Sequence, residues 1–135
     1  MLTILTGLFF VLHGLVHLLY AGQSARRFEL QSGMDWPDGS WAFSKLLGQS
    51  SARTLAGILC ILAAAGFVIA GFGIIFTQPW WRTAAVASAV LSAVLFILFW
   101  NGRFKRLDTQ GGVGVLIDMV ILAAILIFHW PEFAF

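Results

Sequence analysis

The sequence predicts an all-α membrane protein, a bundle of four transmembrane helices. Of its 135 residues, 60% are hydrophobic and only 10% are charged, whereas about a quarter of the residues in soluble domains are charged. The apolar residues gather in four long stretches, each close to the roughly 20 residues that a helix needs to cross a bilayer. These stretches take up most of the chain, so we expect one membrane domain over residues 1–135. The predicted spans are residues 1–22, 54–77, 83–100 and 112–130.

Net charge and cysteine content exclude some classes of function. The formal charge of +2 is small and scattered, whereas nucleic-acid binding needs a clustered basic face. The single cysteine, Cys60, lies inside the second span, so it forms no intrachain disulfide, and we expect a small buried apolar residue there. The lipid bilayer is therefore the expected partner, and nucleic acid is not.

The first span, residues 1–22, is expected to remain in the protein and not to be cleaved as a secretory signal. A signal peptide begins with a basic segment and has a shorter apolar run. Here no lysine or arginine precedes Arg26, and His13 and His17 interrupt the apolar run.

The first connection, residues 23–53, is predicted to carry a short interfacial helix. Pro37 fixes one backbone dihedral and Gly39 permits an unusual one, which together predict a turn. Ser40 can then cap a helix that ends near Gly48 and lies in the interface. A second interpretation makes this connection a lid over a cytoplasm-facing cavity.

Small residues predict close packing of the spans. Helices in lipid associate through close backbone approach, which small side chains permit. Each of the first three spans has a row of such residues at helical spacing, and a tight turn at Pro79 joins spans two and three. We expect a compact bundle, although the same rows would also suit a homo-oligomer. The rows are Gly7 and Gly14, then Ala56, Cys60 and Ala64, then Ala85, Ser88, Ala89 and Ser92.

The fourth span, residues 112–130, begins after a break in the chain and ends at an aromatic anchor. Gly111 and Gly112 provide the break, and Trp130 with Pro131 provides the end.

The distribution of basic residues predicts the orientation. Seven of the eight lysines and arginines lie in the connections after the first and third spans, and only Arg82 lies on the opposite side. Positively charged connections stay in the cytoplasm. We therefore expect a multi-pass protein of the cell inner membrane with both termini outside.

Tryptophan positions agree with these boundaries. The indole ring prefers the headgroup level, where it is half buried and its N–H finds a partner. All six tryptophans lie in a connection or near the end of a span and are expected to anchor the bundle. They are Trp36, Trp41, Trp80, Trp81, Trp100 and Trp130.

Ionisable residues inside the spans form the candidate site. His13, His17 and Tyr20 fall on one face of the first helix. At 1.5 Å per residue, Asp118 lies at about the depth of His17. A carboxylate facing lipid is costly, so Asp118 should face the bundle interior. His17 is its expected partner, with Tyr20 or Ser24 as second choices. His129 lies near the outer surface and is expected to belong to the interface.

Two interpretations of these residues remain open. In the functional one, His13, His17, Tyr20 and Asp118 line a cytoplasm-facing cavity that binds a small molecule or exchanges protons, for which histidine beside carboxylate is suited. In the structural one, a His–Asp pair only fixes helix packing, and the chain is a non-catalytic accessory or assembly subunit of a membrane complex. A third alternative is an oligomeric transporter or channel, whose path would lie between protomers.

Cofactor binding is constrained by the same residues. His13 and His17 share a helix face and, with Asp118, offer metal-ligand types. Metal binding is the weaker interpretation, because the chain has neither the glutamate of a metalloprotease helix nor a further histidine nearby. Haem is not expected within one chain, because His129 lies far from the depth of the other histidines.

The first span also carries a resemblance to a known family. Gly7 and Gly14 are spaced by seven residues, with Phe9 and Phe10 between them. Together with the four-span layout and the overall size, this pattern resembles the small DoxX-like membrane proteins. The resemblance implies a four-helix membrane protein linked to quinone or sulfur redox chemistry, and it assigns no catalytic residue.

Overall fold

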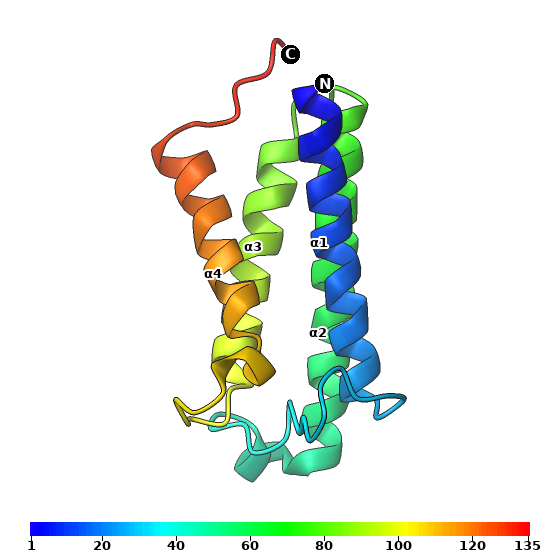
Figure 1. The fold of residues 1–135 in the computed structure, drawn as a ribbon, viewed down its shortest axis with the longest axis vertical. Coiled ribbons are helices and arrows are strands. Elements are labelled where there is room, and N and C mark those ends of the chain that lie inside the picture. The colour runs from blue at the N-terminus through cyan, green and yellow to red at the C-terminus, as the bar shows by residue number, and fades with distance from the viewer.

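The computed structural model describes all 135 residues and contains helices and loops but no strand. The main helices run alternately up and down, and both termini lie at one end of the bundle, the terminal end (Figure 1). The connections after α1 and after α3 lie at the opposite end, the connection end. The elements are α1 (Leu2–Ser24), α2 (Ser44–Ile75), α3 (Trp81–Leu98), a 3₁₀ turn η1 (Leu107–Gln110), α4 (Gly112–Leu122) and a π-helical segment η2 (Ala123–Ile127).

Three helices, α1, α2 and α3, are long and apolar enough to cross a membrane, which supports a multi-pass membrane protein. Their outer faces are apolar, and α1 exposes Leu5, Leu12 and Leu19. The fourth apolar helix is shorter than the predicted span 112–130. Its two segments, of 11 and 5 residues, rise about 24 Å, against roughly 30 Å of hydrocarbon core.

α1 and α2 pack closely through their glycines. A Cβ added to Gly14 would lie 2.9 Å from the carbonyl oxygen of Ala64. A Cβ on Gly7 would lie 2.9 Å from the carbonyl oxygen of Gly71. These distances leave no room for a side chain, so the small residues predicted on span one do lie at a helix–helix contact.

The predicted turn and the predicted short helix of the first connection are both present. The Asp38 N–H donates to the carbonyl of Asp35 at 2.8 Å, which closes the turn. Ser40 Oγ then accepts from the Phe43 N–H at 3.1 Å, one residue before α2 begins. The helical stretch from Ser44 ends at Gly48, where the backbone is not helical (φ 78°, ψ 163°), and the long helix of α2 follows it. The range of α2 therefore includes a short helix that ends at Gly48, as predicted, and the longer helix of the second span.

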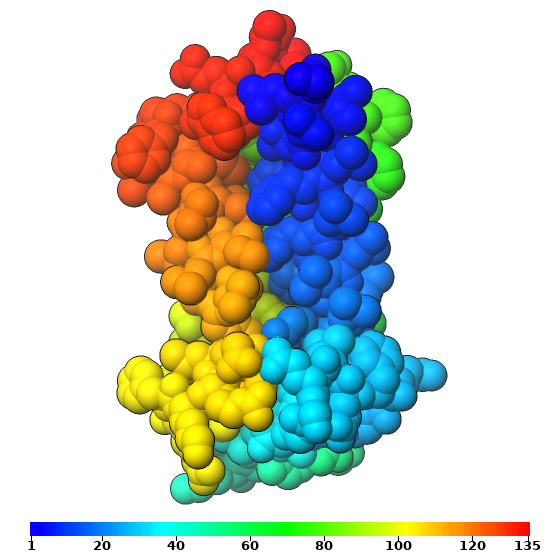
Figure 2. Space-filling view, in the orientation of Figure 1, coloured from blue at the N-terminus to red at the C-terminus, as the bar shows by residue number.

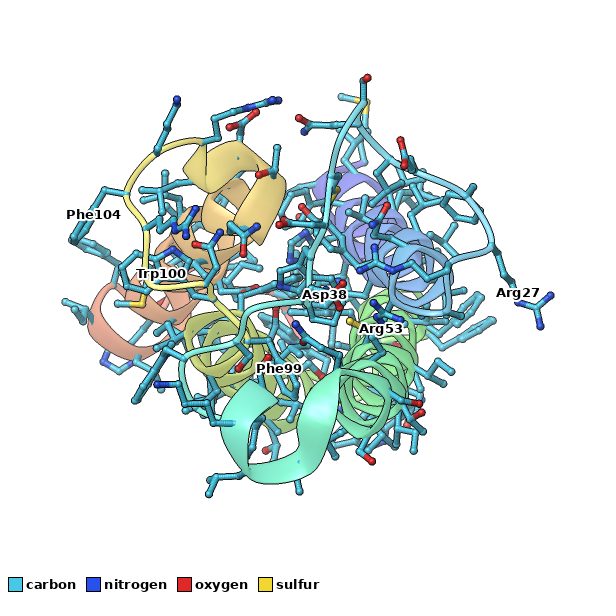
Figure 3. The ribbon with its side chains drawn as sticks, turned by 90° about the horizontal axis from the view of Figure 1, so that it is seen from below. Arg27, Asp38, Arg53, Phe99, Trp100 and Phe104 are labelled. Atoms are coloured by element: carbon cyan, nitrogen blue, oxygen red, sulfur yellow. The ribbon has the colours of Figure 1, made fainter.

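Asp38 ties the first connection to α2 at the connection end. Arg53 donates to its two carboxylate oxygens at 2.7 and 2.6 Å, and Arg26 forms a second ion pair with it. Figure 3 shows Asp38 and Arg53 side by side in this view, with Arg27 pointing outward. Partial burial raises the pKa of Asp38, but hydrogen bonds and positive charge from Arg53 and Arg26 outweigh it, and the net pKa is lowered. The carboxylate is therefore ionised at neutral pH.

The buried apolar residues form two clusters along the bundle. The cluster at the terminal end contains Phe10, Phe67 and Trp81. The cluster at the connection end contains Trp36 and Phe96, together with residues of α2 and α3. No residue belongs to both, so the core is divided at mid-bundle.

Two of the six tryptophans predicted as interface anchors lie inside the protein. Trp36 is fully buried in the connection-end cluster, and Trp81 is 2% exposed against Phe10. Trp36 belongs to the first connection, which folds back over the helix ends, whereas Trp81 is the first residue of α3 and packs against Phe10 and against Phe133 of the C-terminal segment. The other four are exposed or half-buried at the two ends of the bundle: Trp41, Trp80, Trp100 and Trp130.

Candidate functional site

Four polar side chains meet where the two apolar clusters are divided. α1 supplies His13 and His17, one turn apart; α4 supplies Asp118, and α3 supplies Ser92. All four are buried, and Asp118 and Ser92 have no exposed surface. The His17 ring lies 5.3 Å from that of Phe67, in one apolar cluster, and 5.7 Å from that of Phe96, in the other. We call these four residues the polar cluster.

His13 and Asp118 join α1 to α4. His13 Nε2 lies 3.1 Å from Asp118 Oδ1, the distance of an imidazole N–H donating to a carboxylate. The Phe9 ring stacks parallel to the His13 ring, with centroids 6.0 Å apart. The pair is therefore fixed in both position and orientation.

His17 uses both of its ring nitrogens. Nδ1 donates to the backbone carbonyl of His13 at 2.9 Å, because a carbonyl can only accept. In the neutral ring Nε2 then carries the lone pair, which accepts from the Ser92 hydroxyl at 2.7 Å.

Asp118 keeps one carboxylate oxygen without a partner. Oδ2 is buried, and no donor of the protein reaches it. Buried polar atoms nearly always find a hydrogen-bond partner, because an unmet one forfeits its solvation. The polar cluster thus has an acceptor position that its own side chains do not fill.

The partner of Asp118 differs from the expectation. Equal depth had suggested His17, whereas the carboxylate meets His13, one turn further from the connection end. The depth count assumed that the cytoplasmic ends of α1 and α4 are level. Instead the chain makes the turn η1 before α4, with Thr109 and Gln110 buried, and His17 is already occupied by Ser92.

Two of the predicted residues lie apart from the polar cluster. The Tyr20 ring packs against Trp36 and Phe96 at 5.3 and 4.9 Å in the connection-end cluster. His129 is exposed near the terminal end, as expected for an interface residue, and its carbonyl accepts from Arg82. Tyr20 therefore lies almost one turn of α1 beyond His17, on the side of the connection end.

Ser92 is the site residue that sequence reasoning assigned only to packing. Its hydroxyl bonds a side chain on another helix, whereas that of Ser88, one turn earlier, bonds its own helix at Ala84. A serine among small residues in a span gives no sequence signal that separates these two roles.

An apolar groove of about 560 Å³ runs between α1 and α4 beside the polar cluster. These helices approach each other at few positions, whereas α1 packs along α2 and α3 packs along α4. The groove is on the face shown in Figure 2, between the blue and orange helices. None of the four residues of the polar cluster lines the groove, but two of their neighbours do: Phe9, whose ring stacks on His13, and Ile117, which precedes Asp118 in the chain. Its outer walls are formed by Leu5, Val120 and Trp130.

The hollows of the protein bear on the expected cavity, which stays a prediction. The hollow at the connection end between α1 and α2 is lined by residues that include Ser24, Arg26 and Arg53, and by none of the candidate residues. The groove beside the polar cluster opens sideways, toward the space that lipid would occupy.

The three candidate metal ligands are close together. One ligand atom from each of His13, His17 and Asp118 lies within 4.8 Å of the others. Two imidazole nitrogens and a carboxylate oxygen form a common set for transition metals.

No family model, curated protein or solved structure matches this chain. The resemblance to DoxX-like proteins therefore stays a prediction.

Proposed function

We propose that this chain is a four-span membrane protein that binds a small lipophilic molecule at the His13–Asp118 pair. Both termini lie at one end of the bundle, which requires an even number of crossings when the helices span a membrane. Three helices meet the length and hydropathy needed, and the apolar helix Gly112–Ile127 would be the fourth. By the positive-inside rule, the basic connection end faces the cytoplasm of a cell with an inner membrane.

The observation that carries this proposal is the unpartnered Oδ2 of Asp118. A pair that served only to join helices would gain most when both carboxylate oxygens were satisfied, because partly satisfied polar networks are costly in an apolar interior. An acceptor left free beside a groove is typical of a position that a bound molecule completes.

The groove defines the chemistry of that molecule. Its walls are apolar and it opens toward lipid, so the body of the ligand is a hydrocarbon chain or ring. His13 and Asp118 lie behind the lining of the groove. The His13 N–H is already donated to Asp118 Oδ1, so the group left free is the acceptor Oδ2, and the head group of the ligand carries a donor such as a hydroxyl. A quinone, which the DoxX-like resemblance implies, has an apolar tail of this kind, and its reduced quinol form carries a hydroxyl that could donate to Oδ2.

Native mass spectrometry of the mildly solubilised protein tests the proposal, because it reports bound mass directly. Val120 lines the groove and is 68% exposed, so Val120→Trp should fill the groove without disturbing the core. The matched control is Met119→Trp, at the next position, which is 54% exposed and outside the groove. We expect wild type and Met119→Trp to retain a lipophilic adduct, and Val120→Trp and Asp118→Asn to lose it. A ligand-free wild type, or an adduct that survives in both site variants, would contradict the proposal.

The accessory-subunit alternative is favoured by one observation. Both ring nitrogens of His17 are satisfied inside the protein, by the His13 carbonyl and by Ser92, as a structural clasp requires. In that case His17→Ala should lower the thermal stability, and a foreign partner chain should co-purify with the wild type. An oligomeric transporter would instead give a discrete homo-oligomer on crosslinking in the native membrane.

A further inference from the structure

The geometry points to a transition-metal site formed by His13, His17 and Asp118. This inference deepens the proposed function. The part of it that names a bound anion rests on the proposed function. The three residues provide two imidazole nitrogens and one carboxylate oxygen from two different helices. Three protein ligands with a position left open are the pattern of reactive Zn²⁺ sites and of non-haem Fe²⁺ sites.

The distances are compatible with one ion between the three ligands. Atoms no more than 4.8 Å apart share a point within about 2.8 Å of each, against metal–ligand bonds of about 2.0–2.2 Å. The ligands would need to move inward by less than about 1 Å, a shift that side-chain rotation supplies.

His17 is already oriented as a metal ligand. Metal-binding histidines usually donate their second N–H to a carbonyl or carboxylate, which fixes the tautomer and leaves the other nitrogen free to ligate. His17 Nδ1 donates to the His13 carbonyl at 2.9 Å, so the lone pair is on Nε2. The Ser92 hydroxyl occupies that lone pair at 2.7 Å and would turn away when a metal binds.

The unpartnered oxygen of Asp118 is a second observation that points to a bound ion, apart from the spacing of the three ligands. The residue has no exposed surface, and its Oδ2 has no partner although Oδ1 is bonded to His13. A divalent cation beside the carboxylate would satisfy this oxygen and offset the cost of a buried charge.

Charge balance selects what the open position takes. A divalent ion and one carboxylate leave a charge of about +1 among the rings of Phe9, Phe67 and Phe96, where a net charge is costly. A lipophilic monoanion, such as a carboxylate or phenolate carried on an apolar body in the groove, would neutralise it.

Cobalt(II) is the probe for this site. It replaces Zn²⁺ in nitrogen and oxygen sites, and its visible absorption is strong for four-coordinate geometry and weak for octahedral. We expect the purified, metal-stripped protein in mild detergent to take up one Co²⁺ per chain with a four-coordinate spectrum. Zn²⁺ should displace the Co²⁺ one for one, so that the total metal content stays at one ion per chain.

The variants separate this site from adventitious binding. His17→Gln and Asp118→Asn should weaken Co²⁺ binding at least about tenfold, because each removes one of three ligands. His129→Gln is the matched control, because His129 lies outside the polar cluster and should leave uptake unchanged. Ser92→Ala should strengthen binding, because it removes the hydroxyl that competes for Nε2 of His17.

The outcomes distinguish this inference from the proposed function. A folded wild type that carries a lipophilic adduct but takes up no Co²⁺ overturns the metal site alone. Stoichiometric Co²⁺ with no lipophilic adduct overturns the proposed ligand and keeps the metal site. Equal uptake by wild type and His17→Gln, both with intact helix content, also overturns the site. The wild-type stoichiometry decides the matter even where a variant fails to fold.

Discussion

The hydroxyl of Ser92 completes the hydrogen bonding of a histidine that is 1% exposed. His17 Nδ1 is committed to the carbonyl of its own helix, so Nε2 depends on a donor from α3. Within a bilayer no water is at hand to replace that donor. At the residue scale, Ser92 therefore provides a hydrogen bond to His17 as well as the small volume that lets the helices pack closely.

Ser92→Ala should lower the stability of the apo protein by about 1–3 kcal/mol, because a buried ring nitrogen loses its partner. Ser88→Ala is the matched control, because its hydroxyl bonds only its own helix at Ala84 and its loss should cost less. Thermal unfolding of both variants in one detergent measures the difference. Equal shifts in the two midpoints would show that the contact with His17 stabilises nothing.

Three of the four residues of the polar cluster were predictable from the sequence, although their pairing was not. His13, His17 and Asp118 are rare polar side chains in apolar spans, so their inward orientation follows from solvation alone. The partner of Asp118 depends on where α4 begins relative to α1, which the buried turn η1 decides. Tyr20 shares the helix face of the histidines, yet the first connection folds Trp36 against its ring.

At the scale of elements, the contact between α1 and α2 is set by glycines. The Gly14 backbone approaches the carbonyl of Ala64 so closely that a methyl group would fall 2.9 Å from its oxygen. Lipid offers little hydrophobic drive between helices, so the van der Waals contact made at this distance is what holds them.

Gly14→Ala should therefore separate α1 from α2 locally and lower the stability of the bundle by about 1–3 kcal/mol, the typical cost of overpacking. Gly57→Ala is the matched control. Gly57 is likewise a glycine within a helix, here α2, but a Cβ there would meet nothing closer than 3.8 Å. Alanine favours helix over glycine, so this control should be neutral or stabilising. Unfolding of the two variants by a denaturing detergent compares them. A Gly14→Ala protein as stable as Gly57→Ala would contradict the close approach.

The elements themselves followed the sequence closely where hydropathy alone defines them. The three long helices cover most of the predicted spans 1–22, 54–77 and 83–100. The range of α2 begins ahead of its predicted span because it includes the short helix that ends at Gly48. Hydropathy also could not indicate that α4 ends in a π-helical segment, since a π-turn depends on backbone hydrogen bonding and not on composition.

At the scale of the whole molecule, the unequal lengths of the helices raise the question of how many cross the bilayer. α4 and η2 rise about 24 Å, several ångströms less than a typical hydrocarbon core. A short helix in a bundle is accommodated by local thinning of the bilayer, at a modest cost per ångström. Trp130, which follows the helix and is 55% exposed, is placed to anchor that end at the interface.

Cysteine labelling distinguishes four crossings from three. Cys60, the one native cysteine, is fully buried, so it should stay silent toward a membrane-impermeant maleimide. Lys105 lies in the connection before α4 and Glu132 lies after η2, and both are exposed. With four crossings, Glu132→Cys should be labelled in intact cells, and Lys105→Cys only after the membrane is opened. With three crossings, the two positions share one side and must label together. Separate labelling would establish α4 as a span and, with it, the place of Asp118 inside the bilayer.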